Sequence, residues 1–321
     1  MLLMQHKILI AGKQLKNLER LTIINSVDAP LSAAEIVIPY KTIRRPFTVL
    51  HQSNSDLSLI KKGAGVEIHL GYNNKLKLEF EGYITHVDKD NTSITVQCED
   101  KFFEYKKNIA DKIFTNTSIE TIINYIHQQL KLRRPYSIDI DIKYSKFSII
   151  QQTAYDVLKR LAEETHLQIF IKNDHLYITP KMLKKFNLIK YHTEKNIEKI
   201  EFEKTNLSEH KVEIIIETKN KQGQTIQYTY GERGGDKIYL KIQGIENQKD
   251  LKKIAEQAYN NTKINYQKKC KIIGWLQPYT SPGDVVELKG TEINDGLYYC
   301  QKVEVHYGET GGMRNLYCVE I

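Results

Sequence analysis

The sequence predicts a mainly β protein with an α+β segment in its middle third. Apolar and polar residues alternate with a period of two through the first and last thirds, and the spacing changes to that of an amphipathic helix between them. The length of 321 residues exceeds one typical core and suits two or three domains. We therefore expect β-rich domains at both ends and a smaller α+β domain between them.

The first third has the pattern of half-buried strands. Val66, Ile68 and Leu70 alternate with polar neighbours, which places one face of the strand on a core and the other in polar surroundings. Glycine, asparagine and aspartate residues separate the alternating runs and supply turns. Strands are expected at 21–27, 34–38, 66–72, 76–80 and 94–98, and residues 41–62 are expected to form a long excursion.

The middle third has two segments with helical spacing. Residues 117–120 fit a capping box, and isoleucines then recur on one face as far as Leu130. A second helix is expected from Thr153 to about His166, followed by a hairpin over residues 167–179. Residues 181–195 are polar, basic and weakly patterned, so we predict a linker there.

The last third returns to alternation, interrupted by one helix that Asn247 can cap. Residues 231–236 are rich in glycine but lie between two expected strands, which indicates a loop tip rather than a phosphate-binding loop. Strands are expected at 212–216, 226–230, 238–242, 284–289, 297–307 and 315–321.

The two β-rich thirds share one rhythm. Each has a glycine-bounded strand, a longer strand and a third strand with a cysteine near its middle or end. We match Gly65 with Gly283 and Cys98 with Cys318, although 33 positions separate the first pair of residues and 35 the second. This rhythm indicates a diverged duplication of one β module.

The positive charge is concentrated in the middle third. The chain has a net charge of +8, and residues 101–200 alone carry 18 Lys and Arg against 11 Asp and Glu. Two interpretations remain open: a surface for an acidic partner, or a solvated lysine-rich face.

The sequence lacks the motifs of common enzyme and metal sites. It contains no GxxxxGK[ST], HExxH or GxSxG. Asp139 and Asp141 share one face of an expected strand, but the spacing and the glycine of a calcium loop are missing. We therefore predict no catalytic, cofactor-binding or metal-binding residues.

Three residues deserve a separate comparison, because a histidine and a cysteine can form a nucleophilic pair. His86 and Cys98 stand on the apolar phase of their expected strands, whereas His69 shares the polar phase with Glu67. This pattern favours a core histidine and a buried thiol over catalysis. All four cysteines are predicted to be structural thiols: Cys98, Cys270, Cys300 and Cys318.

Several short stretches resemble one known family in the order in which that family has them. Residues 80–87 (FEGYITHV) and 94–100 (ITVQCED) resemble its F-x-G-x-I … V-x-C-x-D stretch. Residues 154–162 (AYDVLKRLA) with the hairpin after them resemble its middle module, and residues 281–288 (SPGDVVEL) resemble its PGD-x-V signature. The family is that of phage baseplate hub proteins of the late-control and Mu type, which are related to the hub part of type VI secretion spike proteins.

The resemblance implies two tail-tube-like antiparallel β-barrel domains that flank a small α+β domain. We place the first barrel at 1–110, the α+β domain at 111–190 and the second barrel at 191–321. It also implies a homotrimer that forms a pseudo-sixfold ring and joins a hexameric tail tube to a trimeric spike. Because the chain stops on a strand at Ile321, we expect the spike to be encoded separately.

A structural role in a contractile injection machine follows from the resemblance, without cofactors or stable nucleic-acid binding. No secretion signal or membrane segment is visible in the sequence. We therefore expect synthesis in the bacterial cytoplasm and a final place in a virion tail, a baseplate or an equivalent particle. Two alternatives remain: a tail-associated cell-wall hydrolase, which a peptidoglycan assay would reveal, and a basic nucleic-acid-binding module, which would bind oligonucleotides in a salt-sensitive way.

Overall fold

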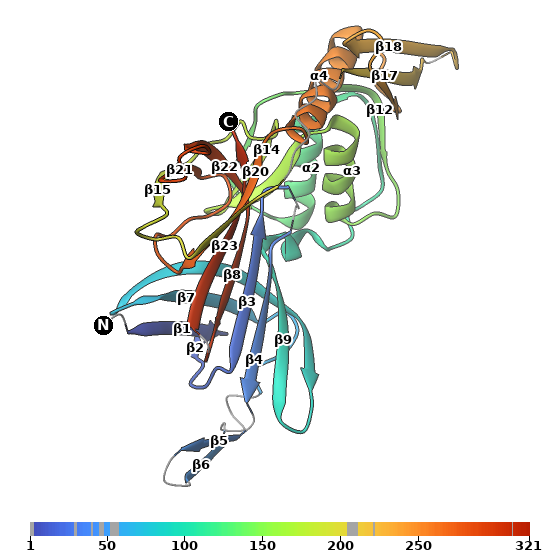
Figure 1. The fold of residues 1–321 in the computed structure, drawn as a ribbon. Helices are drawn as coiled ribbons and strands as arrows, with labels where there is room; N and C mark the ends of the chain where they lie inside the picture. Colours follow the sequence, from blue (N-terminus) through green and yellow to red (C-terminus); the bar gives the residue numbers. More distant parts are fainter. Residues whose placement is uncertain are drawn as a thin grey trace.

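A computed structural model shows a long curved sheet that runs through the molecule, with the helices gathered at one end (Figure 1). It describes residues 3–28, 31–39, 41–44, 48–51, 58–203, 211–220, 222–309 and 311–321. The mainly β class with a helical middle part is confirmed. No helix of these residues is long and apolar enough to cross a bilayer.

One sheet of thirteen strands combines strands from both β-rich thirds of the described chain, while β5 (Lys41–Arg44) with β6 (Thr48–His51) and β17 (Val212–Lys219) with β18 (Thr225–Gly231) and β19 (Asp236–Lys241) form separate sheets. Its longest path runs β16-β20-β23-β22-β3-β4-β9-β8-β7-β1-β2, and β15 and β21 extend it beside β22. The strands are β1 (Met4–Ile10), β2 (Lys13–Gln14), β3 (Arg20–Ser26), β4 (Ala33–Pro39), β7 (Gly65–Tyr72), β8 (Lys75–Lys89), β9 (Ser93–Asp100), β15 (Leu188–His192), β16 (Lys199–Phe202), β20 (Lys269–Trp275), β21 (Val285–Lys289), β22 (Gly296–Gly308) and β23 (Gly311–Glu320).

Two barrels closed by backbone hydrogen bonds are not present among these described strands, which corrects that part of the prediction. The reason is the length of β22. Its first residues pair with the short β21, and its second half, Lys302 to Gly308, pairs with β3 from the first third of the chain. The two halves are thereby joined into one sheet. The first half also curls back, because His6 Nδ1 on β1 lies 3.0 Å from the hydroxyl of Tyr307 on β22.

The predicted repeat is confirmed in strand order. In the first half β7, β8 and β9 form a meander, β9 also pairs with β4, and β4 pairs with β3. In the second half β21, β22 and β23 form the same meander, β23 also pairs with β20, and β20 pairs with β16. The outermost strand differs, since β1 runs antiparallel to β7 whereas β15 runs parallel to β21.

The repeat extends to individual residues. Cys98 lies opposite Ile84, a bulge follows, and the pairing resumes at His86; Cys318 lies opposite Cys300, and the pairing resumes in the same way at Lys302. Cys98 and Cys318 are therefore equivalent, as predicted.

The glycine alignment is corrected by two positions. The N–H groups of Gly63 and Gly283 donate to Ile84 and Cys300, both at 2.8 Å, and both glycines have positive φ, 84° and 87°. Gly63, rather than Gly65, is thus the counterpart of Gly283. Each of these two glycines stands 35 positions before its cysteine.

A second core lies beside the sheet and contains the helices (Figure 1). Asn247 caps α4 as expected, and Thr153 forms a capping box with Asp156 at the start of α3. The expected capping box of Thr117 with Glu120 is corrected, because Ser118 is the N-cap of α2 and its side chain accepts from Thr121 N. The elements are η1 (Lys101–Tyr105), α2 (Ile119–Leu130), α3 (Ala154–Thr165), α4 (Gln248–Ile264), β10 (Lys112–Ser118), β11 (Tyr136–Ile138), β12 (Lys143–Ile149), β13 (Gln168–Lys172), β14 (His175–Thr179), β17 (Val212–Lys219), β18 (Thr225–Gly231) and β19 (Asp236–Lys241).

Two predicted connections contain regular structure. The expected linker at 181–195 includes β15, which pairs in parallel with β21. The expected excursion at 41–62 includes a separate hairpin of β5 (Lys41–Arg44) and β6 (Thr48–His51), which extends away from the large sheet (Figure 1). Residues 45–47 and 52–57 of that excursion lie outside the described residues.

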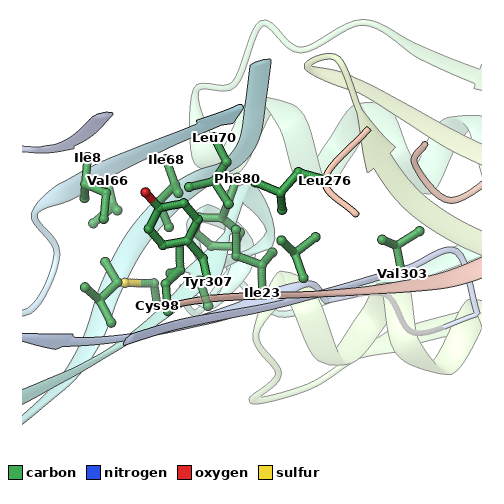
Figure 2. Packing of buried hydrophobic residues seen from close by; sticks show 14 of the residues in the cluster. Ile8, Ile23, Val66, Ile68, Leu70, Phe80, Cys98, Leu276, Val303 and Tyr307 are labelled. Atoms are coloured by element: carbon green, nitrogen blue, oxygen red, sulfur yellow. The ribbon is translucent and has the colours of Figure 1, made fainter. Parts of the chain in front are cut away.

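Both halves of the sheet enclose one hydrophobic core. Ile8, Ile68 and Phe80 from the first half pack in the same cluster as Val303 and Tyr307 from the second (Figure 2). The second core combines α2 and α3 with α4 and the sheet of β17, β18 and β19. Segments from the last third of the chain therefore contribute to both cores.

Candidate functional site: the joint between the sheet halves

The pairing of β3 with β22 joins the two repeated modules within one chain. Ile23 lies opposite Val305 and Leu21 lies opposite Tyr307 in an antiparallel register. All four side chains are buried. The joint is therefore a continuous piece of sheet with an apolar inner face, and it holds the modules in a fixed relation.

A buried ion pair crosses the core beneath this joint. The guanidinium of Arg314 on β23 contacts the carboxylate of Glu79 on β8, and the two residues are 2% and 7% exposed. Arg314 also donates to the carbonyl oxygens of Leu276 and Thr280, at 3.2 and 2.9 Å. Burial raises the pKa of Glu79, and the charge of Arg314 opposes that shift. Each charge is thus compensated only while the halves stay together.

The predicted PGD signature forms a clamp between the sheet and the helical core. Asp284 is fully buried and accepts hydrogen bonds from the backbone N–H groups of Ser281 and Asn187, at 2.8 and 3.2 Å. Lys172, at the end of β13, donates to the hydroxyl of Ser281 and the carbonyl of Pro282, at 2.8 and 2.7 Å. Its ammonium lies 3.4 Å from the Asp284 carboxylate and 3.9 Å from the centre of the Phe186 ring. The motif therefore positions one core on the other.

A chain of ion pairs fixes the first sheet half to the helical core. Lys101 bridges Glu81 and Asp174, at 2.8 and 3.3 Å. Arg134 bridges the same Asp174 and Glu104, at 3.0 and 2.8 Å. The side chain of Arg134 is 5% exposed, so this part of the network is shielded from salt.

A cavity of about 230 Å³ lies where the two sheet halves and the β13–β14 turn meet. Glu79, Glu81, Lys101, Lys172 and Asp174 line it. Lys101 pairs with Glu81 and Asp174, Lys172 pairs with Asp284, and Glu79 pairs with Arg314. The cavity is therefore lined by ion pairs that connect the sheet halves and the helical core.

The three residues considered as a nucleophilic site point to different places. Cys98 is buried, and burial raises the pKa of its thiol to about 12. His69 lies beside Glu67, with Nε2 3.5 Å from the carboxylate. His86 is exposed and contacts Asp88 at 2.9 Å, which corrects the prediction of a core histidine. The bulge after Ile84 inverts the strand phase and turns His86 outward.

The two aspartates compared with a calcium loop lie in a bend after β11 rather than on one strand face. Asp139 accepts from Lys184 at 2.8 Å, whereas Asp141 uses its backbone carbonyl to accept from Lys253. No group of three or more His, Cys, Asp or Glu side chains suited to a metal ion is found in the described part of the chain. Residues 231–236 form the expected turn between β18 and β19.

Three of the four cysteines form a row that the sequence does not reveal. Cys270 and Cys300 lie on either side of Cys318 on the neighbouring strands β20 and β22. All three are buried and unbridged. The two neighbouring thiols, together with burial, raise the pKa of Cys318. Strand register alone brings them together, because 30 and 18 positions separate them along the chain.

The basic residues of the middle third are not equivalent. Lys131 and Arg133 are exposed at the end of α2, and Lys131 adopts a left-handed conformation there. Arg134, which the sequence places in the same basic group, is buried in the ion-pair network. Only part of the positive charge that the sequence concentrates in residues 101–200 is therefore exposed on the surface.

Two solved structures with this fold are described as tail proteins. No family model matches the chain, and no curated protein matches it. A 43 kDa tail protein of prophage MuSo2 from Shewanella oneidensis has a TM-score of 0.71 and 13% identity, over 99% of this chain and 98% of its own. A tail protein from Neisseria meningitidis MC58 also has a TM-score of 0.71, with 12% identity over 99% of this chain and 97% of its own.

The same fold occurs in the Escherichia coli c3393 protein, described as a component of the type VI secretion system with structural similarity to the T4 tail proteins gp27 and gp5. It has a TM-score of 0.64 and 8% identity, over 98% of this chain and 77% of its own. At these identities the likeness establishes the fold. The sequence resemblance to tail hub proteins is confirmed at that level.

Proposed function

We propose that this chain is a structural hub subunit of a contractile injection machine, and that it acts by assembly rather than catalysis. The observation that carries the proposal is the pair of modules with equivalent strand order, bulge and glycine turn, joined edge to edge in one sheet. The likeness over nearly the full length of two phage tail proteins supports it.

The two modules explain how one chain can join parts of different symmetry. Three copies would place six similar modules around an axis, which matches a sixfold tube on one side and a threefold spike on the other. In this proposal the large-sheet strands of residues 1–110 and 191–321, with β15, supply the two tube-like modules. Residues 111–190 supply the small domain between them, together with α4 and β17–β19, which pack in the same core. The ring, the tube and the spike are all parts of the proposal.

Co-purification with candidate partners tests this function. The full chain is co-expressed with the tube and spike proteins encoded near its gene, and the complex is sized by multi-angle light scattering. We expect three hub chains for every three spike chains, with each interface burying on the order of 1,200–2,000 Å² or more. A well-folded chain that binds neither partner contradicts the proposal.

An activity assay tests the non-catalytic part separately. The purified chain is incubated with peptidoglycan, and soluble fragments are measured against a buffer control. We expect no release above background. Release that persists after purification to homogeneity would instead identify a cell-wall hydrolase.

A further inference from the structure

Three cysteines of the second module lie side by side on neighbouring strands. Cys318 on β23 lies opposite Cys270 on β20 and opposite Cys300 on β22. All three are at most 3% exposed, and none is bridged. Directly opposite residues project to the same face of a sheet, so the three thiols form one buried row. The row offers two thiol pairs that share Cys318.

The equivalent row of the first module has only one thiol. Cys98, the counterpart of Cys318, lies opposite Ile84 on β8 and opposite Ala34 on β4. Ile84 and Ala34 are buried, as their counterparts in the second module are. Apolar side chains therefore fill these positions in the same strand order, so the fold itself does not require cysteine there.

Backbone hydrogen bonds show how Cys300 faces Cys318. The N–H of Cys300 donates to the carbonyl of Asp284 at 2.9 Å, and the carbonyl of Cys300 accepts from Gly283 at 2.8 Å. Both backbone groups of Cys300 thus point away from β23. Cys300 and Cys318 therefore form a non-hydrogen-bonded pair, the kind in which opposite side chains approach each other more closely.

The other pair of the row has the opposite phase. The N–H of Glu320 donates to the carbonyl of Lys268 on the β20 side at 2.9 Å. Cys318 stands two residues before Glu320 and faces Cys270, two residues after Lys268. Since the phase repeats every two residues, this is a hydrogen-bonded pair with the wider separation.

We propose that Cys300 and Cys318 form a reversible cross-strand disulfide when the chain reacts with a peroxide. A disulfide holds its Cβ atoms about 3.5–4.5 Å apart. Directly opposite Cβ atoms lie about 4.5–5.5 Å apart, and those of non-hydrogen-bonded pairs are the closer ones. The pair with Cys300 therefore meets this limit better than the pair with Cys270.

Hydrogen peroxide is the oxidant, because it is small enough to reach a buried pair during brief local opening. Its O–O bond breaks as one thiol becomes a sulfenic acid, and one water is released. The second thiol then attacks the sulfenic sulfur, the S–S bond forms, and the hydroxyl leaves as a second water. Two thiols and one peroxide thus give one disulfide and two waters.

The disulfide would fasten two strands that both reach the first module. β22 pairs with β3 from Lys302 onward, and β23 carries Arg314, whose guanidinium contacts Glu79. A bond between Cys300 and Cys318 lies at the bulge where the β3–β22 pairing begins. It would therefore stiffen the joint between the modules. The inference concerns one chain and does not depend on the proposed function.

Peptide mapping of the oxidised chain tests the pair. The reduced full chain is treated with hydrogen peroxide at about pH 8.5, because the neighbouring thiols and burial raise the pKa of Cys318. It is then blocked with N-ethylmaleimide in denaturant and digested with trypsin. Cleavage after Lys302 and Arg314 places Cys300 and Cys318 in separate peptides. We expect free thiols to fall from four to two, and the linked peptides to separate after treatment with dithiothreitol.

Two variants identify the partners. Cys270→Ala should keep the disulfide, whereas Cys300→Ala should lose it. Oxidation should raise the melting temperature of the wild type and of Cys270→Ala by about 5–10 °C, since the bond closes a loop over 18 positions. The melting temperature of Cys300→Ala should not change on oxidation.

A third variant tests the geometry in the first module. Ile84 has the backbone bonds of Cys300, because it accepts from Gly63 at 2.8 Å and donates to Ala64 at 2.9 Å. It therefore faces Cys98 in the same non-hydrogen-bonded phase. Ile84→Cys should add a second disulfide, with Cys98. A folded variant without this disulfide counts against the geometric argument.

The peptide map of the wild type decides the inference even if a variant fails to fold. A disulfide between Cys270 and Cys318 overturns the choice of partner. Four unchanged thiols, or sulfinic acids without a linked peptide, overturn the reactive pair. Each of these outcomes leaves the proposed hub function standing, because binding to the tube and the spike is measured separately.

Discussion

Buried charges hold the sheet halves together, and single changes there are expected to cost the most stability. In the variant Arg314→Met, Glu79 remains 7% exposed without its cation, and the carbonyls of Leu276 and Thr280 lose a donor. We expect the free energy of unfolding to fall by about 3–5 kcal/mol. Urea denaturation followed by circular dichroism measures this change.

Two control variants test whether the loss comes from an unpaired buried charge. The double variant Glu79→Leu/Arg314→Met removes both charges and should cost less than the single change, because no unpaired ion stays buried. The variant Arg20→Ala breaks a surface pair with Glu35, whose partners are 65% and 42% exposed, and should cost less than about 1 kcal/mol. Equal losses in all three would contradict a special role for the buried pair.

Asp100 predicts a pH dependence of stability. It caps η1 through Phe102 N and also accepts from Ser32 N, and burial raises the pKa of its carboxyl to about 6. The folded state therefore binds the proton more tightly than the unfolded state, whose pKa is about 4. This contribution to stability is fully present below about pH 4 and is lost as the pH rises through about 6.

The variant Asp100→Asn measures that contribution, because asparagine stays neutral. Urea denaturation at about pH 4.5 and 7.5 gives the difference in unfolding free energy between variant and wild type. We expect this difference to shift in favour of the variant at the higher pH, whatever hydrogen bond the amide loses. A pH-independent difference would show that Asp100 titrates normally.

The individual residues show where sequence patterns stop being informative. Cys98 was placed correctly because its strand phase is regular. His86 was misplaced because a bulge one residue earlier inverts the phase, and a bulge leaves no clear mark in alternation. The row of Cys270, Cys300 and Cys318 depends on the register of three strands, which local sequence does not encode.

Strand packing gives a prediction at the scale of elements. A methyl group on Gly82 would lie 2.0 Å from the carbonyl oxygen of Glu99 on the neighbouring strand, whereas one on Gly65 would meet no atom within 4 Å. Gly82→Ala should lower the free energy of unfolding by about 1–3 kcal/mol through overpacking. Gly65→Ala should change it by less than about 0.5 kcal/mol.

Thermal denaturation measures the melting temperature of both variants. Gly65 and Gly82 lie on the paired strands β7 and β8, so they form a matched comparison. If Gly82→Ala melts at the wild-type temperature, the close approach of β8 and β9 is wrong. A large loss in Gly65→Ala would instead show that the space beside Gly65 is not open.

Helices were predicted more completely than connections. α2, α3 and α4 have amphipathic periods and capping residues within the segment itself, so local sequence suffices. β15 was mistaken for a linker because it is a short edge strand with only Tyr191 buried, and its partner β21 lies almost a hundred residues away. Long-range pairing decides such elements.

For the whole molecule, the sequence predicted two modules but not how they join. The shared rhythm identified the repeat, and an error of two positions in the glycine alignment left its register unresolved. The expectation of separate barrels failed because the free half of β22 accepts β3. Similarly, α4 and β17–β19 follow the second module's β16 in sequence but pack in the helical core.

The charge distribution leads to a prediction for the assembled particle. We expect the exposed basic residues at the end of α2, Lys131 and Arg133, to lie on the outside of the proposed ring. A basic channel in that ring would bind DNA through many phosphate contacts, and the total affinity rises steeply with their number. Such binding would hinder the release of DNA from the proposed channel. A cryo-EM map of the hub with tube and spike locates α2, and the outcome that counts against the prediction is Lys131 and Arg133 facing the channel. Oligonucleotide binding at low salt provides the control. The assembled complex is compared with the variant Lys131→Glu/Arg133→Glu, which should bind the oligonucleotide more weakly if these residues are exposed on the outside.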